Sequence, residues 1–189
     1  MTPRGYGPGA SFCPRCAAAL PGPAPTTCTR CGYQLFVNAR PTASLVILDR
    51  VPAVRPERRN AVASSVAELR FLALRRAAEP MIGRWETPGG FCDGWEHPAE
   101  AAVREAREEL GVPINLGDHI GMYVGSYEFQ DEILPVLDNF FLATLADPRI
   151  VLDPAESAEL SWFSLVDPPP LAFATMDAAL RDAARRLGA

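Results

Sequence analysis

Runs of apolar and polar residues predict five strands and two helices along the chain. Short runs rich in β-branched and aromatic residues predict strands at 44–49, 69–74, 119–128, 138–145 and 160–163. Helical periodicity predicts helices at 98–110 and 176–187, closed by Gly111 and Gly188. The polar stretch 51–68, rich in Pro and Arg, is expected to be a long loop joining two strands. Strands and helices are interspersed, so the pattern leaves open an α/β or an α+β fold.

The helix at 98–110 separates two kinds of residue onto two faces. Its apolar positions form one stripe at helical spacing, expected to be the core face: Ala99, Ala102, Val103, Ala106 and Leu110. Glu105, Glu108 and Glu109 lie at i, i+3 and i+4, within an arc of about 100° on another face.

Two interpretations account for these three glutamates. They repel one another and lie at the negative end of the helix dipole, each effect costing on the order of 0.3–1 kcal/mol. A divalent cation with hard oxygen ligands, Mg²⁺ or Mn²⁺, would remove both penalties. The alternative is a solvated acidic helix end, neutralised in part by Arg104 and Arg107, and the helix alone does not decide between the two.

Four of the five cysteines form two C-x-x-C pairs, Cys13 with Cys16 and Cys28 with Cys31, eleven residues apart. Two such pairs supply the four thiolates of a tetrahedral zinc site. Four thiolates leave no open coordination position, so the predicted Zn²⁺ is structural. Two disulfides are the alternative. Cys92 stands alone, and no metal role is expected for it.

Composition narrows the chemistry further. All 18 basic residues are Arg, which excludes a phosphate-loop lysine and a Schiff-base lysine, and two histidines exclude a His-rich metal site. A net charge of −5 argues against general attraction to nucleic acid or anionic membranes. The chain has neither an apolar run of about 18 residues nor an N-terminal apolar segment, so we expect a cytoplasmic protein with no membrane span.

The stretch from Gly90 to Val112 resembles the signature of the Nudix hydrolase family. That signature is G, five residues, E, seven residues, R-E, an aliphatic, any residue, E-E, any residue, G and an aliphatic. Every fixed position is filled, by Gly90, Glu96, Arg104, Glu105, Glu108, Glu109 and Gly111. The preceding Trp85 and Pro88-Gly89-Gly90 are also similar to the family's entry into this motif.

The resemblance implies an α/β/α sandwich around a mixed sheet and hydrolysis of a nucleoside diphosphate linked to another moiety X. It implies that Glu105, Glu108 and Glu109 bind divalent metal or act in catalysis, with the backbone carbonyl of Gly89 as a further ligand. It also implies that Glu96 and Arg104 brace the loop and helix by an ion pair. We therefore expect a zinc ribbon at 1–37 and a Nudix domain at 38–189.

A zinc ribbon before such a domain resembles the NADH pyrophosphatase branch, in which an acidic residue at the place of Glu156 contributes to the metal site. Glu159 is a near rival. That branch's S-Q-P-W-P-F-P-x-S run is missing from 117–135, so the resemblance does not extend to NAD(H) specificity. Tyr123 and Tyr127 could stack a substrate ring, but an aromatic row on a strand is more often core packing.

Three functions therefore remain. The first is Mg²⁺- or Mn²⁺-dependent hydrolysis of a small nucleotide such as ADP-ribose, NADH, FAD or a related dinucleotide. The second is removal of a nucleotide cap from RNA, for which 55–59 is the only basic patch. The third, a sensing or protein-binding module without turnover, fits poorly with an intact glutamate set. A homodimer is compatible with the sequence.

Overall fold

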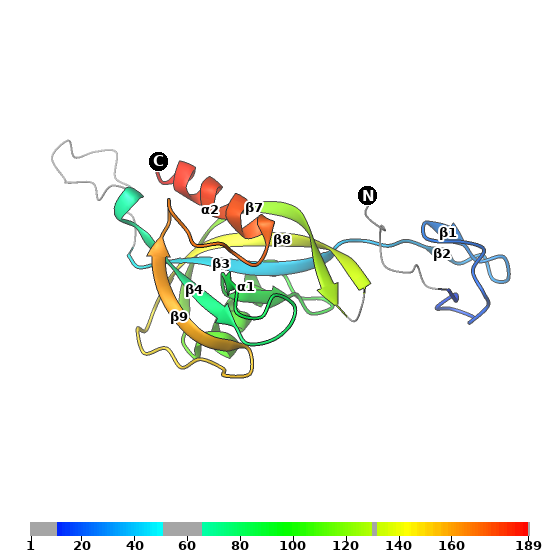
Figure 1. The fold of residues 1–189 in the computed structure, drawn as a ribbon. Helices are drawn as coiled ribbons and strands as arrows, with labels where there is room; N and C mark the ends of the chain where they lie inside the picture. Colours follow the sequence, from blue (N-terminus) through cyan, green and yellow to red (C-terminus); the bar gives the residue numbers. More distant parts are fainter. Residues whose placement is uncertain (1–10, 51–65, 130–131, 189) are drawn as a thin grey trace. The chain divides into compact units, whose positions relative to one another are not determined.

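The computed structural model describes residues 11–50, 66–129 and 132–188. Its elements, in chain order, are β1 (Thr26–Thr27), β2 (Gln34–Leu35), β3 (Arg40–Leu48), η1 (Val66–Glu68), β4 (Arg70–Arg76), β5 (Trp85–Glu86), β6 (Gly89–Phe91), α1 (Pro98–Leu110), β7 (Ile114–Phe129), β8 (Glu132–Leu145), β9 (Ser157–Ser164) and α2 (Ala174–Arg186). Figure 1 shows their arrangement.

The chain divides into two compact units. The first comprises the chain up to Arg40 together with Ser126–Val136, and the second comprises Pro41–Gly125 with Leu137–Ala189. In the first unit β1 and β2 form a two-stranded antiparallel sheet. The second unit holds both helices and most of the large sheet. The division lies close to the predicted boundary between residues 37 and 38, whose status as a domain boundary stays a prediction.

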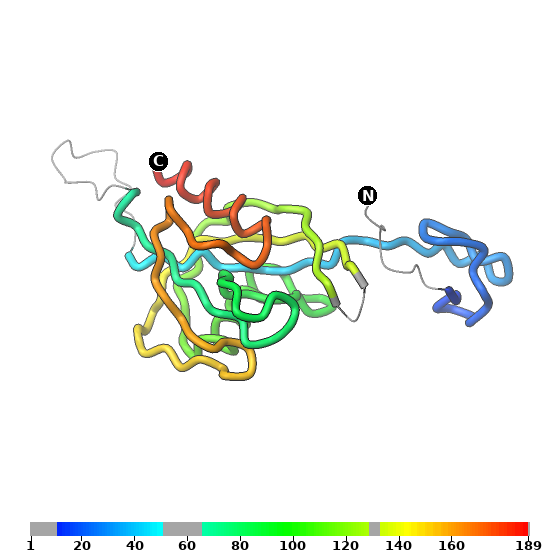
Figure 2. The backbone as a smooth tube through the Cα atoms, viewed as in Figure 1, coloured from blue at the N-terminus to red at the C-terminus, as the bar shows by residue number. Residues whose placement is uncertain are grey.

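The large sheet is mixed and lies between the two helices. Its strand order is β5-β4-β3-β8-β7, with β6 paired to β3 and β9 paired to β4. β9 runs antiparallel beside β4 from Arg70–Ser164 to Arg76–Ser157, the orange and turquoise segments of Figure 2. The sheet and its helices form the α/β/α sandwich that the family resemblance implied.

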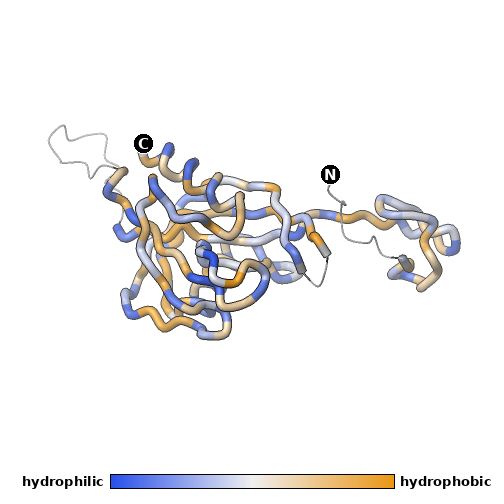
Figure 3. The backbone as a smooth tube through the Cα atoms, viewed as in Figure 1, coloured by the Kyte–Doolittle hydropathy of each residue, from blue (hydrophilic) through white to orange (hydrophobic). Residues whose placement is uncertain are grey.

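Side chains of β3 and β4 alternate between two cores, one on each face of the sheet. Val46, Leu48 and Phe71 join the cluster that packs against α2. Leu45 and Leu72 belong to the cluster that packs against α1. Because both faces are covered, these strands read as continuous apolar runs rather than as alternating ones. α2 itself alternates hydrophobic and hydrophilic residues, as Figure 3 shows.

All five predicted strands overlap observed strands, although the predictions at 44–49 and 69–74 each include one residue, Asp49 and Leu69, that lies outside β3 and β4. β3 begins at Arg40 rather than residue 44. β7 is longer than the predicted 119–128 at both ends, and β8 begins six residues before the predicted 138–145. The helix at 98–110 has the predicted bounds, whereas α2 runs Ala174–Arg186 instead of 176–187. Within the predicted loop 51–68, residues 51–65 lie outside the described residues and 66–68 form η1.

Within the described part of the chain, no helix is both long enough and apolar enough to span a membrane.

Candidate active site and cysteine cluster

The helix α1 is fixed at both ends by local bonds. His97 caps the start: its Nδ1 accepts a hydrogen bond from the Ala99 backbone N–H (3.1 Å), and Glu100 accepts one from the His97 N–H (3.2 Å). This reciprocal arrangement is a capping box. Gly111 ends the helix in the left-handed conformation with φ 66°, and its N–H donates to the Arg107 carbonyl (3.1 Å). The register of the three glutamates is therefore fixed.

The buried face of α1 differs from the predicted stripe in one way that matters. Ala102, Ala106 and Leu110 are buried as expected, and Ala101 and Glu109 are buried with them. Glu109 is only 5% exposed, whereas Glu108 on the same helix is exposed. The three glutamates thus span the range from core to solvent instead of sharing one solvated face.

Arg104 organises the exposed side of the site. Its Nε and Nη2 donate to the two carboxylate oxygens of Glu96 (3.0 and 2.9 Å), and Nη2 also donates to the Phe91 carbonyl (3.0 Å). Its Nη1 donates to Glu105 and to Glu108, each at 2.8 Å. The ion pair between Glu96 and Arg104 expected from the resemblance is present. Hydrogen bonds from Arg104 and from the Asp93 N–H lower the pKa of Glu96 to about 2.

Two glycines bring β6 against the helix. The Gly89 N–H donates to Oε2 of Glu109 (2.8 Å), which ties the buried carboxylate to the strand. A Cβ on Gly90 would lie 2.6 Å from Oε1 of Glu105. Gly90 therefore leaves the space that the Glu105 carboxylate occupies. The motif glycines set the distance between the loop and the glutamates.

Burial raises the pKa values of two of the three glutamates, Glu109 and Glu105. Burial first, and then the negative charge of Glu86, raise the pKa of Glu109 well above its ordinary value. Burial also raises the pKa of Glu105, although Arg104 opposes the shift. The charge of Glu156 acts in the same direction on both carboxyls. These carboxylates are therefore close enough to repel one another, and a cation would relieve the repulsion.

Glu86 is a further acid of this region that the sequence reasoning missed. It is 7% exposed on β5 and forms an ion pair with Arg76. Arg76 also donates to the Pro80 carbonyl (2.6 Å) and lies 5.5 Å from the centre of the Phe173 ring. Burial raises the pKa of Glu86, and Arg76 opposes that rise. Glu86 lies three residues before Gly89, and no periodicity distinguishes a strand glutamate that turns inward.

The structure separates Glu156 from its rival Glu159. The charge of Glu156 raises the pKa values of Glu86, Glu105 and Glu109. The carboxylate of Glu159 instead lies 3.4 Å from Arg75 in an exposed ion pair. Proximity therefore favours Glu156 as the fourth acidic donor, and its metal role stays a prediction.

The two tyrosines lie in different units. Tyr123 belongs to the second unit, packs edge-on against Phe140 at 5.6 Å and donates from its hydroxyl to Asp182 (2.7 Å). These contacts match the core-packing alternative. Tyr127 is half-buried and belongs to the first unit. Substrate stacking by either ring stays a prediction.

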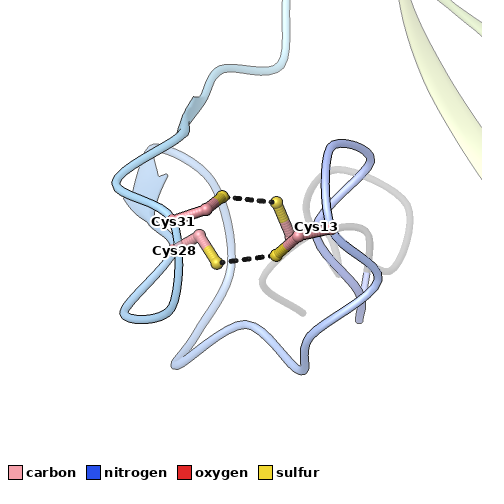
Figure 4. Close-up of side chains that lie close together, drawn as sticks. Cys13, Cys28 and Cys31 are labelled. Atoms are coloured by element: carbon pink, nitrogen blue, oxygen red, sulfur yellow. Dashed lines mark hydrogen bonds between the residues drawn. The ribbon is translucent and has the colours of Figure 1, made fainter.

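The four paired cysteines converge as a zinc site requires. The sulfur of Cys13 lies 3.7 Å from that of Cys31, and the sulfur of Cys16 lies 3.6 Å from that of Cys28. Figure 4 shows Cys13, Cys28 and Cys31 directed at one another. Zn–S bonds of about 2.3 Å in a tetrahedron put sulfur atoms about 3.8 Å apart. The cysteines are not disulfide-bonded, so the residues present fit Zn²⁺.

The two cysteine turns have the same backbone design. The N–H of the residue one place beyond each pair, Ala17 or Gly32, donates to the carbonyl of Cys13 or Cys28 (2.8 and 2.9 Å). Both residues adopt the left-handed conformation, with φ 56° and 72°. The backbone N–H of Cys31, opposed by burial, lowers the pKa of the Cys28 thiol to about 6. For Cys31, the Tyr33 backbone N–H lowers the thiol pKa, but burial and the hydrogen bonds of the other three cysteines outweigh it and raise the pKa to about 12. Zn²⁺ binding would therefore release protons from part of this cluster.

The predicted oxygen donors are less tightly grouped than the cysteines. Among the residues that the structure describes, the four cysteines are the only group of three or more Cys, His, Asp or Glu side chains whose ligand atoms all lie within 4.8 Å of one another. Gly89 holds Glu109, while Arg104 draws Glu105 and Glu108 toward itself. The hard oxygen donor set and its excess negative charge nevertheless fit Mg²⁺ or Mn²⁺.

These features define an α/β/α protein in which an acidic helix is held beside the glycines of a short strand. The NUDIX domain model matches residues 57–186, and the chain belongs to the Nudix family. Solved structures agree on the fold. A NUDIX hydrolase from Nitrosomonas europaea has a TM-score of 0.67 at 19% identity, covering 94% of this chain and 93% of that one. The MutT NUDIX hydrolase from Burkholderia pseudomallei has a TM-score of 0.57 at 24% identity, covering 77% and 98%.

Curated relatives carry several different activities in their names. An NAD-capped RNA hydrolase NudC from Pseudomonas entomophila is 35% identical over 99 residues, 52% of this chain and 33% of its own. An ADP-ribose pyrophosphatase from Methanocaldococcus jannaschii is 30% identical over 105 residues, 55% and 60%. A CTP pyrophosphohydrolase from Escherichia coli is 38% identical over 53 residues, 28% and 39%. The chain thus matches between a third and 60% of the length of these relatives.

Proposed function

We propose that this protein is a metal-dependent pyrophosphohydrolase that cleaves a diphosphate bond in a nucleoside diphosphate linked to another moiety. The observation that carries the proposal is the position of Glu105 and Glu109 beside Gly90 and Gly89 of β6, with Glu108 joined to Glu105 through Arg104. The charge of Glu156 acts on both Glu105 and Glu109. The substrates named for the similar proteins, NAD-capped RNA, ADP-ribose and CTP, share a phosphoanhydride bond.

The charge balance explains why a cation belongs in this mechanism. The negative charges of five glutamates influence one another in this region: Glu86, Glu105, Glu108, Glu109 and Glu156. Arg76 pairs with Glu86, and Arg104 pairs with Glu105 and Glu108. A diphosphate would add further negative charge. Bound Mg²⁺ or Mn²⁺ supplies the positive charge that stabilises the phosphoryl oxygens and lowers the pKa of an attacking water.

The residues of this chain would divide the remaining work. Glu105, Glu108, Glu109 and Glu156, with the Gly89 carbonyl, would hold the metal. Arg104 orients Glu105 and Glu108 through one nitrogen, so the two carboxylates keep a fixed separation. The Gly89 N–H orients Glu109. One of these carboxylates would accept the proton of the attacking water.

The test is a product-release assay with Mg²⁺ or Mn²⁺ against ADP-ribose, NADH, FAD, diadenosine polyphosphates, nucleoside triphosphates and capped RNA. Glu109→Gln keeps the shape and the acceptor for the Gly89 N–H but removes the charge, so we expect turnover to fall at least about hundredfold. Glu159→Gln is the matched control because its carboxylate pairs with Arg75. Equal turnover in Glu109→Gln and the native protein would contradict the proposal.

Cap removal from RNA is the second candidate, favoured by the similarity to NudC. It predicts faster turnover of capped RNA than of the free dinucleotide. It also predicts a steep loss of RNA turnover as salt rises, because phosphate contacts release counterions. The same panel, run for RNA and dinucleotide at two salt concentrations, separates the two candidates.

A further inference from the structure

Trp95 is the most exposed large apolar side chain in the described part of the protein, at 104% of its reference area. The other two tryptophans, Trp85 and Trp162, are partly buried against the two cores. Isolated exposed apolar residues are common on protein surfaces. Trp95 differs because an entire indole stands in solvent on the motif loop next to the predicted metal-binding helix.

The loop that carries Trp95 is held by several hydrogen bonds. The Asp93 N–H donates to the Glu96 carboxylate, and the Glu96 N–H donates to the Asp93 carbonyl, both at 3.0 Å. Arg104 grips both carboxylate oxygens of Glu96 and also bonds the Phe91 carbonyl. A ring held out from a fixed turn loses less entropy on binding than a ring on a mobile loop.

Arg104 also connects this loop to the reaction site. The guanidinium that holds Glu96 donates at 2.8 Å to both Glu105 and Glu108. A Cβ added at the neighbouring Gly94 would meet nothing within 4 Å, so no atom crowds the loop at this position. One guanidinium thus holds both Glu96, the residue that follows Trp95, and two of the predicted metal-binding carboxylates.

We propose that Trp95 is a specificity residue that stacks on a heteroaromatic ring of the substrate. This inference rests on the proposed function for the position of the diphosphate. Stacking on a tryptophan favours planar bases of any identity over sugars, because every base has a π-face. Loss of one base–aromatic stack weakens the affinity for the ligand by about 5- to 150-fold.

The first experiment measures ring contact without requiring turnover. Iodide quenches exposed indoles, and Trp95→Phe supplies the background from the two partly buried tryptophans. Adenosine diphosphate ribose and NAD⁺ are titrated with Mg²⁺ into the full-length native protein and into Glu109→Gln. We expect either nucleotide to protect the Trp95 signal from iodide, and ribose 5-phosphate, which has no ring, to leave it unprotected. No protection by any nucleotide that binds would overturn the inference.

The second experiment compares variants on whichever substrate is hydrolysed. Trp95→Leu keeps an apolar side chain without a π-face and should raise KM at least about fivefold, with kcat little changed. Trp95→Phe should restore KM to within about threefold, and both variants should melt like the native protein. An unchanged KM in Trp95→Leu would refute the role.

The two proposals fail in distinguishable ways. Protection without turnover of any compound supports ring stacking and counts against the hydrolase. Turnover with no effect of Trp95 substitution supports the hydrolase and overturns ring stacking. Protection that grows with protein concentration in the absence of nucleotide would show that a second copy of the chain covers the indole, which also overturns it.

Discussion

The substitution Gly90→Ala should separate the chemistry of the site from the stability of the fold. The added Cβ would lie 2.6 Å from Oε1 and 2.8 Å from Cδ of Glu105, whereas ordinary contact begins at 3.4 Å. The carboxylate must therefore retreat by about 0.8 Å, the difference between the first and last of these distances. Its 2.8 Å bond from Arg104 must stretch or reorient with it.

The magnitude follows from which atom has to move. A displacement of about 1 Å in a group that positions a reaction costs roughly hundredfold in rate. The displaced atom ends a flexible side chain, and Gly90 is not in the left-handed region, so the free energy of unfolding should change by only about 1 kcal/mol. We expect Gly90→Ala to lose about 30- to 100-fold in kcat/KM while melting within a few degrees of the native protein.

Two neighbouring glycines serve as controls. Gly94→Ala adds a methyl group into open space, so both activity and melting temperature should stay near native. Gly89→Ala would put its Cβ 2.2 Å from the Ala43 carbonyl at φ 142°, against backbone that cannot retreat. It should cost about 3 kcal/mol or more and lower the melting temperature by about 6–12 °C.

The assay is Mg²⁺-dependent product release beside a thermal melt for the three variants. The reasoning is refuted if Gly90→Ala keeps activity within about twofold of Gly94→Ala. It is also refuted if Gly90→Ala melts as low as Gly89→Ala, because the loss would then belong to the fold.

Three further outcomes follow from the same contacts. Arg104→Lys replaces a fork with a point charge that cannot hold Glu96 through two bonds, so kcat/KM should fall roughly 10- to 100-fold, and native-like rates would contradict this. Because the folded-state pKa of Glu109 is raised, its contribution to stability is full below about pH 4.5, the ordinary value, and is lost as pH rises through the folded-state pKa. The increase in melting temperature on adding Mg²⁺ should therefore grow from pH 5 to pH 8, and this increase should be smaller in Glu109→Gln. Cys28→Ser should abolish the stoichiometric zinc measured by elemental analysis, and retained zinc at one ion per chain would reject the four-cysteine site.

Local signals predicted α1 and its surroundings well, because the determinants of that region are short in sequence. Pro98 and Gly111 limit the helix, and the structure has the same bounds. The ion pair between Glu96 and Arg104 spans eight residues and forms as the resemblance implied. The spacing of the four cysteines likewise brings their sulfurs together.

What the sequence did not reveal depends on how one structural element packs against another. A helical projection places Glu109 beside Glu105, but it does not show that β6 covers Glu109 and leaves Glu108 in solvent. Glu86 gives no pattern at all, since its burial depends on the pairing of β5 with β4, where its partner Arg76 lies. Although Arg76 and Glu86 are only ten residues apart, they meet because β4 and β5 pair in one register, and a single sequence does not show that register.

The buried ion pair of Arg76 and Glu86 shows that the arginines of this region neutralise only some of its glutamates. Glu86, whose charge acts on Glu109, has its own arginine, whereas Glu109 itself accepts a hydrogen bond from the Gly89 backbone N–H. A second arginine at Glu109 would remove the repulsion but would also occupy the carboxylate that a metal needs. Arg104 follows the same rule, because it bonds Glu105 and Glu108 from the exposed side and leaves the buried side toward Gly89 free of arginine contacts among the described residues. The arginines therefore help to fix where the carboxylates lie, and under the proposed function a divalent cation would balance the remaining charge.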